Sequence, residues 1–148
     1  GSEMCKETGK GLGFSAAAEK ELKVLIGAVS EILNTAERAF SEKDLAAAAQ
    51  VEPLKQVIVA LKEQMRTRHI LRMQQGTCSI EAGFVLSDLL TDLERTSDHC
   101  SNIAVCVSQI HSGSFDTHEY LHALKKEEEF ETEYKELKKQ YQLPTLKA

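Results

Sequence analysis

The stretch that decides the fold is LKVLIGAVSEILNTAERAF, residues 22–40. Its apolar side chains recur every three or four residues without interruption, which is the spacing of one face of an α-helix. They are Leu22, Leu25, Ile26, Val29, Ile32, Leu33, Ala36 and Phe40. The pattern predicts an amphipathic helix from about Ser15 to Phe40, with one face available for burial against other helices.

Two further segments repeat this helical pattern. Ser41, with Asp44 three residues later, approximates a capping box and predicts the start of a second helix. Its apolar stripe consists of Leu54, Val57, Ile58, Leu61 and Met65. Gly76 is a typical helix end, and a third apolar pattern then extends from about Ser79 to Ile110.

A fourth, more polar helix follows. Asp116 with Glu119 three residues later is a helix start signal, and Pro144 marks the end of the segment. No run of alternating β-branched residues predicts a strand anywhere in the chain. We therefore expect an all-α fold, an antiparallel three-helix bundle with an additional C-terminal helix, in one domain over residues 14–148.

The chain ends and the composition limit the possible functions. Residues 1–13 begin like a cloning remnant and continue without periodicity, so we expect a flexible lead-in there. No run approaches the about 18 apolar residues of a membrane helix. The 18 basic and 23 acidic residues form no long block of one sign, which argues against nucleic acid as a partner. The four cysteines lack a C-x-x-C spacing, which is typical of reduced thiols.

The third predicted helix carries an unusual number of charges among its leucines. One stripe consists of Asp88, Asp92, Arg95 and His99. Glu94 and Asp98 lie on another side, four residues apart, where two carboxylates either share a cation or repel each other by a few tenths of a kcal/mol. Two interpretations stay open, a cation site and a solvated face whose charges are balanced by Arg95 and neighbouring lysines.

The segment LTDLERTSDHCSNIA, residues 90–104, resembles the signature helix of PhoU domains, with an acidic residue, Glu-Arg, Asp and Asn-Ile-Ala in that order. Residues 51–104 and FDTHEYLHALK, residues 115–125, are similar to the cytoplasmic C-terminal domain of bacterial sodium/phosphate (Na/Pi) cotransporter family proteins. The resemblance implies a PhoU-like bundle that regulates phosphate transport and is not an enzyme. It also implies a transmembrane transporter domain as partner, on the cytoplasmic side of the membrane.

The resemblance further implies possible metal binding, because some family members hold iron or zinc with acidic motifs on the second and third helices. The matching candidate ligands here are Glu94, Asp98, Asp88, Asp92 and Glu52. The second helix departs from the family pattern, since Lys55 and Val59 stand where relatives commonly have acidic residues. An ammonium group repels a metal cation, and Lys55 could instead pair with Glu94 or Asp98 across the bundle.

The remaining polar residues favour structural roles. His118, Glu119 and His122 supply one Glu-x-x-His motif, whereas a di-iron site of the ferritin type needs two, so we expect these histidines at the surface. His69 and His99 are more typical of hydrogen-bonded structural residues than of phosphotransfer sites. Three arginines near the end of the second helix would complement its negative end. They are Arg66, Arg68 and Arg72.

Catalysis finds little support, because the sequence has no nucleophile elbow and no glycine-rich phosphate loop. Two alternatives to a transporter tail stay open, a carboxylate-bridged metal-binding enzyme and a free-standing phosphate uptake regulator. Some apolar residues lie outside the three core stripes and would suit a homodimer interface. They are Val59, Phe84, Val105 and Ile110.

Overall fold

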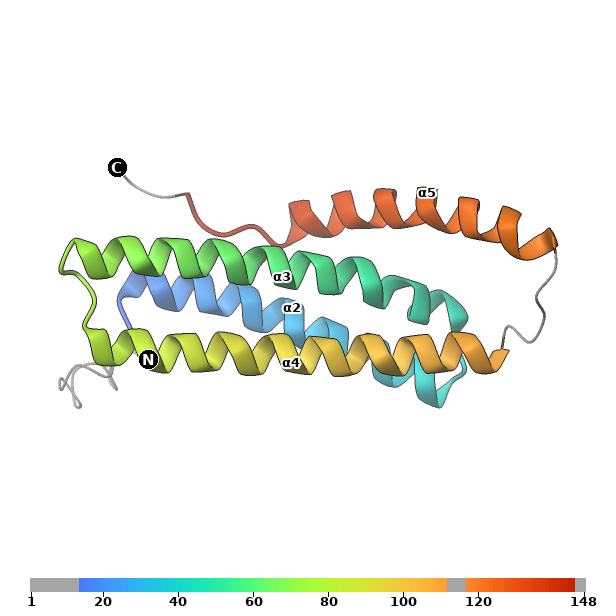
Figure 1. Ribbon diagram of the computed structural model, residues 1–148, viewed down its shortest axis with the longest axis horizontal. Coiled ribbons are helices and arrows are strands. Elements are labelled where there is room, and N and C mark those ends of the chain that lie inside the picture. Colours follow the sequence, from blue (N-terminus) through green and yellow to red (C-terminus); the bar gives the residue numbers. More distant parts are fainter. Residues whose placement is uncertain (1–13, 112–116, 146–148) are drawn as a thin grey trace.

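The computed structural model describes residues 14–111 and 117–145, and for residues 111 and 117–127 it describes the backbone alone. The helices of this part are α2 (Ala16–Ser41), α3 (Leu45–Gln74), α4 (Ile80–His111) and α5 (Thr117–Gln140). Helices α2, α3 and α4 pack against one another, and α5 lies along α3 on the side away from α4 (Figure 1). The predicted all-α bundle with an additional C-terminal helix is confirmed. No helix in the described residues contains an apolar stretch of the length that a membrane span requires.

The helix starts follow from side-chain caps. Ser15 Oγ accepts a hydrogen bond from the Ala18 N–H at 3.1 Å, as expected for an N-cap serine. At the second start the prediction was wrong by one turn, because Ser41 is the last residue of α2 and Asp44 is the cap of α3. The Asp44 carboxylate accepts from the Ala47 N–H at 3.1 Å, and Lys43 makes the tight turn before it with a φ of 53°.

The turn between α3 and α4 lies where the sequence predicts it. Gly76 adopts a left-handed φ of 75°, which glycine tolerates better than other residues. The Thr77 N–H donates to the Arg72 carbonyl at 2.9 Å and so terminates α3. Ser79 Oγ then accepts from the Ala82 N–H at 3.1 Å and caps α4. The reversal makes α4 antiparallel to α3 and parallel to α2 (Figure 1).

The core forms where the apolar faces of α2, α3 and α4 meet. Its largest fully buried apolar side chains include Leu25, Ile32, Leu54, Ile58, Met65 and Leu86. The predicted stripe on the first helix is too wide, because Ile26, Leu33 and Phe40 are exposed. Two neighbouring helices cover only part of a helix surface, so the edge of a wide apolar stripe remains in contact with solvent.

Helix α5 is attached to the bundle by its C-terminal end. Leu137 is buried in the core, and Tyr141 is partly buried beside it. The Tyr141 hydroxyl donates to Glu31 Oε1 at 2.8 Å, and Arg68 Nη1 donates to the Pro144 carbonyl at 2.6 Å. The predicted start of this helix at Asp116 lies outside the described residues. The attachment places the end of α5 over the α2–α3 side of the bundle.

Candidate functional site

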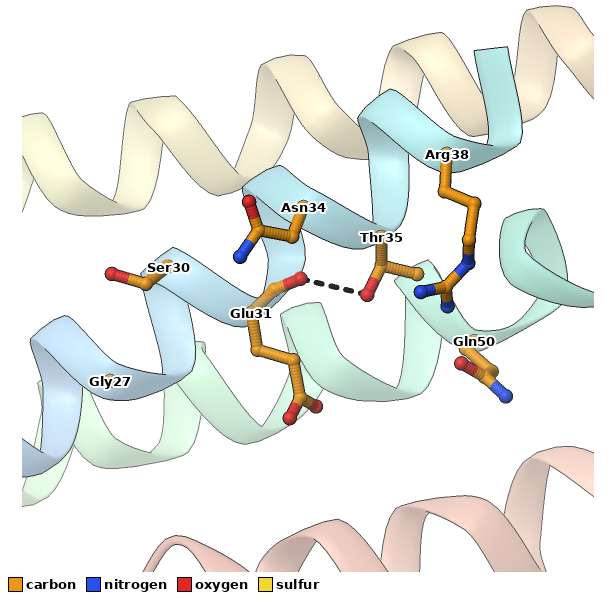
Figure 2. A pocket seen from close by; sticks show the side chains of 7 residues that line it. All are labelled: Gly27, Ser30, Glu31, Asn34, Thr35, Arg38 and Gln50. Carbon is orange, nitrogen blue, oxygen red and sulfur yellow. Dashed lines mark hydrogen bonds between the residues drawn. The ribbon is translucent and has the colours of Figure 1, made fainter. Parts of the chain in front are cut away.

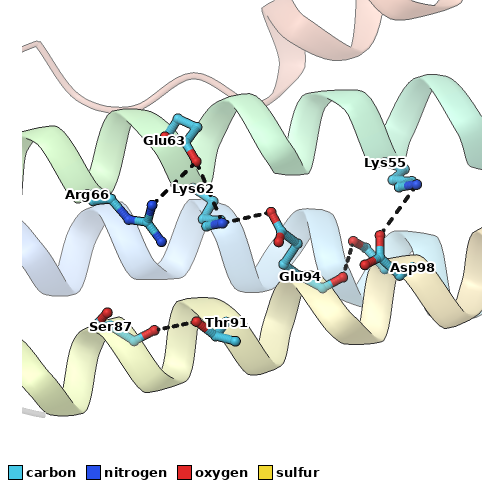
Figure 3. Close-up of polar contacts among 9 residues, drawn as sticks. Lys55, Lys62, Glu63, Arg66, Ser87, Thr91, Glu94 and Asp98 are labelled. Carbon is cyan, nitrogen blue, oxygen red and sulfur yellow. Dashed lines mark hydrogen bonds and ion pairs between the residues drawn. The ribbon is translucent and has the colours of Figure 1, made fainter.

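The acidic residues of α4 point to different sides of the helix. Glu94 and Asp98 are half-buried and face α3 (Figure 3), whereas Asp88 and Asp92 are exposed. The separation follows from the helical turn of about 100° per residue, which rotates Glu94 by about 240° from Asp88. The structure therefore does not bring the candidate ligands of α4 together into one cluster.

Two lysines of α3 neutralise the carboxylates that face them. Lys62 Nζ donates to Glu94 Oε2 at 2.9 Å, and Lys55 Nζ lies 3.4 Å from Asp98 Oδ1 (Figure 3). Pairing of Lys55 with a carboxylate of α4 agrees with the sequence analysis, whereas Lys62 was missed. The signal was present, since Lys62 follows Lys55 by seven residues, or about two helical turns, and so lies on the same side of α3.

Glu52 continues this row of contacts toward the start of α3. Its Oε2 accepts a hydrogen bond from Ser101 Oγ at 2.7 Å, and its Oε1 accepts from Gln56 Nε2 at 3.4 Å. We call the three contacts between the helices the α3–α4 polar seam. They are Glu52 with Ser101, Lys55 with Asp98, and Lys62 with Glu94.

The residues of the polar seam do not fit an iron or zinc site as they stand. Such a site needs several oxygen, nitrogen or sulfur ligands around one point. Among the side chains that the structure describes, no group of three or more His, Cys, Asp or Glu residues could hold a metal ion. The ammonium groups of Lys55 and Lys62 also lie where a cation would have to approach Asp98 and Glu94. Metal binding by the five candidate carboxylates stays a prediction, and the lysines oppose it.

A second ionic cluster lies at the opposite end of α3, and its central residue was not predicted from the sequence. Glu21 is only 2% exposed, and its Oε2 accepts from Arg72 Nη2 at 2.5 Å and from Arg68 Nη1 at 3.0 Å. The two arginines therefore bind a carboxylate of α2, beyond their predicted effect on the end of their own helix. Glu21 precedes the core residue Leu25 by four positions, so its place on the buried face was a readable signal.

His69 and Cys78 lie beside this cluster without forming a reactive pair. Cys78 Sγ is 3.6 Å from His69 Nδ1. Burial lowers the pKa of His69, with a smaller contribution from Arg72, and burial raises the pKa of the Cys78 thiol. Both groups are thus held neutral, whereas nucleophilic cysteines require a thiolate. A Cβ atom on Gly83 would lie 2.8 Å from His69 Nε2, so His69 is a tightly packed structural residue.

The sequence also singles out His99, His118 and His122. His99 is exposed on α4. The side chains of His118 and His122 lie outside the described residues, and so does that of Glu119. The predicted surface positions of His118 and His122 therefore stay predictions.

A polar groove lies between α2 and α3, near the end of α5 (Figure 2). It is lined by Gly27, Ser30, Glu31, Asn34, Thr35, Arg38 and Gln50. Its two charged residues have partners, since Arg38 Nε lies 3.8 Å from Asp44 Oδ2 and Glu31 accepts from Tyr141. Burial, followed by the hydrogen bond to Glu31, raises the pKa of Tyr141 to about 12. The groove therefore presents no unpaired acid and base for catalysis.

Comparisons with known proteins agree with the fold. Residues 22–107 match the PhoU domain. The chain is 31% identical to the phosphate-specific transport system accessory protein PhoU homolog 1 of Thermotoga maritima over 94 residues. The 94 aligned residues are 64% of this chain. The chain spans 40% of the length of that relative. No solved structure gives a significant match.

Proposed function

The chain belongs to the PhoU domain family, and from this premise we propose that it is a regulatory, non-catalytic domain that controls phosphate transport. The observation that carries the proposal is the position of the family match. Residues 22–107 extend from α2 through α3 into α4, so the matched sequence covers most of the packed three-helix unit. The name of the relative from Thermotoga maritima, an accessory protein of a phosphate-specific transport system, supports the same function.

The proposal has a more specific form, in which the domain is the soluble tail of a sodium/phosphate cotransporter on the cytoplasmic side of the bacterial membrane. The similarity of residues 51–104 and 115–125 to cotransporter tails supports this form. A free-standing phosphate uptake regulator fits the curated relative at least as well. Sequencing the gene upstream of the Cys5 codon separates the two, because a tail requires preceding apolar spans of about 20 residues.

The proposed mechanism is conformational coupling between the domain and its transporter. The ionic groups support a structural role, because Glu21, Glu94 and Asp98 are each paired with a cationic side chain of α3. The neutral states of His69 and Cys78 also weigh against nucleophilic chemistry. In this view the domain acts through the surfaces that it presents, and through the way the transporter packs on them.

Self-association is a separate part of the proposal. Phe84 and Val105 are exposed, as a homodimer interface requires. Ile110 is also exposed, near the end of α4, whereas Val59 is half-buried. Size-exclusion chromatography with light scattering tests this part. A dimer that Phe84→Ser/Val105→Ser converts to monomer would support it, and a monomer at high concentration would contradict it.

The test of the main proposal is phosphate uptake in the source cells. Cells that lack residues 14–148 should no longer reduce uptake of radiolabelled phosphate when external phosphate is abundant. Restoring the segment should restore the response, and sulfate uptake serves as the control for general damage to transport. Uptake that responds to phosphate equally with and without the segment would refute the proposed regulation.

A further inference from the structure

The side of the bundle where α2 packs next to α4 carries exposed apolar side chains. We call this surface the α2–α4 face. It consists of Ile26, Leu33 and Phe40 of α2 with Val85, Ile103 and Ile110 of α4, and these six side chains are 40–74% exposed. Helix α5 packs on α3 instead (Figure 1). Several exposed apolar side chains on one face of a bundle are typical of interaction sites.

The position of the three α2 residues follows from helical spacing. They are seven residues apart, about two turns, so they form one stripe along the helix. Gly27 and Glu31 lie across α2 from this stripe, at about 100° per residue, and they face the end of α5. The stripe of Ile26, Leu33 and Phe40 is therefore on the side of α2 next to α4.

Helical spacing also places the three α4 residues. Ile103 follows Val85 by 18 residues and precedes Ile110 by seven, which are about five turns and two turns. The α3 side of α4 is fixed by Glu94 and Asp98, which pair with lysines of α3. The apolar stripe of α4 lies across the helix from these carboxylates, so it borders α2. Two parallel stripes thus flank the line where α2 and α4 meet.

The charges beside these stripes are mostly negative. Helical spacing places exposed Glu37, Glu81, Asp88 and Asp92 next to the apolar residues, against Lys23 and Arg95. Two copies of the face brought together by a two-fold axis would oppose like charges. A partner with lysine or arginine beside its apolar side chains would instead be attracted.

We propose that the α2–α4 face binds an amphipathic helix that carries apolar side chains along one stripe and basic side chains beside it, supplied by the transport protein. The identity of the partner rests on the proposed function. Two parallel apolar stripes on neighbouring helices suit a helix with apolar residues spaced by three, four and seven positions. Cytoplasmic segments of membrane proteins carry an excess of Lys and Arg, which matches the charge that the face requires.

The test is binding of the full chain to a synthetic probe, a labelled amphipathic helical peptide with leucines on one stripe and lysines beside them. A second peptide has glutamate in place of every lysine. The lysine peptide should bind, its affinity should fall with salt, and the glutamate peptide should bind at least ten times more weakly. Leu33→Ser/Phe40→Ser should reduce binding of the lysine peptide at least tenfold, and Asp88→Asn/Asp92→Asn several-fold.

Matched control variants lie on other faces. Ile70→Ser/Leu71→Ser removes two exposed apolar side chains from α3, and Glu128→Gln/Glu129→Gln removes two charges from α5. Both controls should bind the lysine peptide like the unaltered protein, and circular dichroism should show that all variants fold. Absence of binding, equal binding of both peptides, or equal loss in the control variants would overturn the proposal.

Two other results separate the possible explanations. A dimer in light scattering that Leu33→Ser/Phe40→Ser converts to monomer would mean that a second copy covers the face, and the proposed occupant would be wrong.

Phosphate uptake separates this inference from the proposed function. If removal of residues 14–148 abolishes regulation but Leu33→Ser/Phe40→Ser does not affect it, the docking site is wrong and the proposed function stands. If removal has no effect while the peptide binds as expected, the proposed function fails and the basic-helix site remains.

Discussion

Glu21 is a carboxylate in a position that an apolar residue would normally occupy. Its side chain is buried between α2 and α3, and its charge is compensated mainly by Arg72 and Arg68. Glu21→Ala would leave a buried guanidinium without its counter-charge, which typically costs about 3–5 kcal/mol. Urea unfolding should show a loss of this size. Glu37→Ala, at an exposed position of the same helix, should change the free energy of unfolding by less than about 0.5 kcal/mol. Similar small losses for both variants would contradict this account.

His69 should make stability sensitive to mild acid. Burial lowers the pKa of His69 in the folded protein, so the unfolded chain binds the proton more readily. The contribution of neutral His69 is therefore fully present above its unfolded value of 6.5 and is lost as pH falls below it. The melting temperature should fall between pH 7.5 and pH 5.5, where most carboxyl groups stay ionised.

The control for this pH effect is His69→Gln, which removes the titrating ring. The variant will be less stable overall, yet its melting temperature should depend less on pH in the same interval. His99→Gln, at an exposed position, should retain the pH dependence of the unaltered protein. An equally steep fall in His69→Gln would assign the effect to other groups.

Single residues also show where sequence reasoning stops. Asp88, Asp92, Glu94 and Asp98 were recognised as unusual, and their separation into two sides followed from helical spacing. The partners of Glu94 were not found, because a contact between helices depends on how far one helix is shifted along the other. That shift is set by packing of the whole core, which no short motif contains.

At the scale of the helix, the sequence predicts that a helix is present more accurately than it predicts where that helix begins and ends. All four helices were expected, because each has an apolar period or a start signal that extends over several turns. The start of α3 was placed at Ser41, since Ser41 and Asp44 are both good caps and only the local backbone decides between them. Exposure of Ile26 and Phe40 was also missed, because periodicity gives the direction of a side chain but not the extent of the neighbouring helix.

One hydrogen bond of the α5 attachment can be tested alone. Tyr141→Phe removes the hydroxyl that donates to Glu31 and keeps the ring that packs on the core. Because the site is partly exposed, we expect a loss of about 1 kcal/mol in the free energy of unfolding. Tyr134→Phe, whose hydroxyl has no such role here, is the matched control. Hydrogen exchange should become faster near the C-terminal end of α5 in Tyr141→Phe, and unchanged exchange there would argue against this attachment.

At the largest scale, the described chain is the three-helix unit of the PhoU family with α5 packed on α3. The metal content of the purified protein tests the metal hypothesis. Lys55 and Lys62 already compensate the carboxylates of the polar seam, so we expect less than one equivalent of iron or zinc per chain. Elemental analysis of protein purified without a histidine tag measures this content. Glu94→Ala/Asp98→Ala is the comparison, and one equivalent of metal that this variant loses would establish the site.

The close approach of His69 to Gly83 limits how this protein can change over evolutionary time. An alanine at position 83 would place its Cβ 2.8 Å from His69 Nε2 and 2.9 Å from Met73 Sδ. Methionine is flexible and can move away, whereas the histidine ring is enclosed. Alanine at position 83 should therefore be harmful while His69 is present and tolerated after His69 has been replaced by a smaller residue. The order in which the two substitutions arise decides whether a lineage can acquire both.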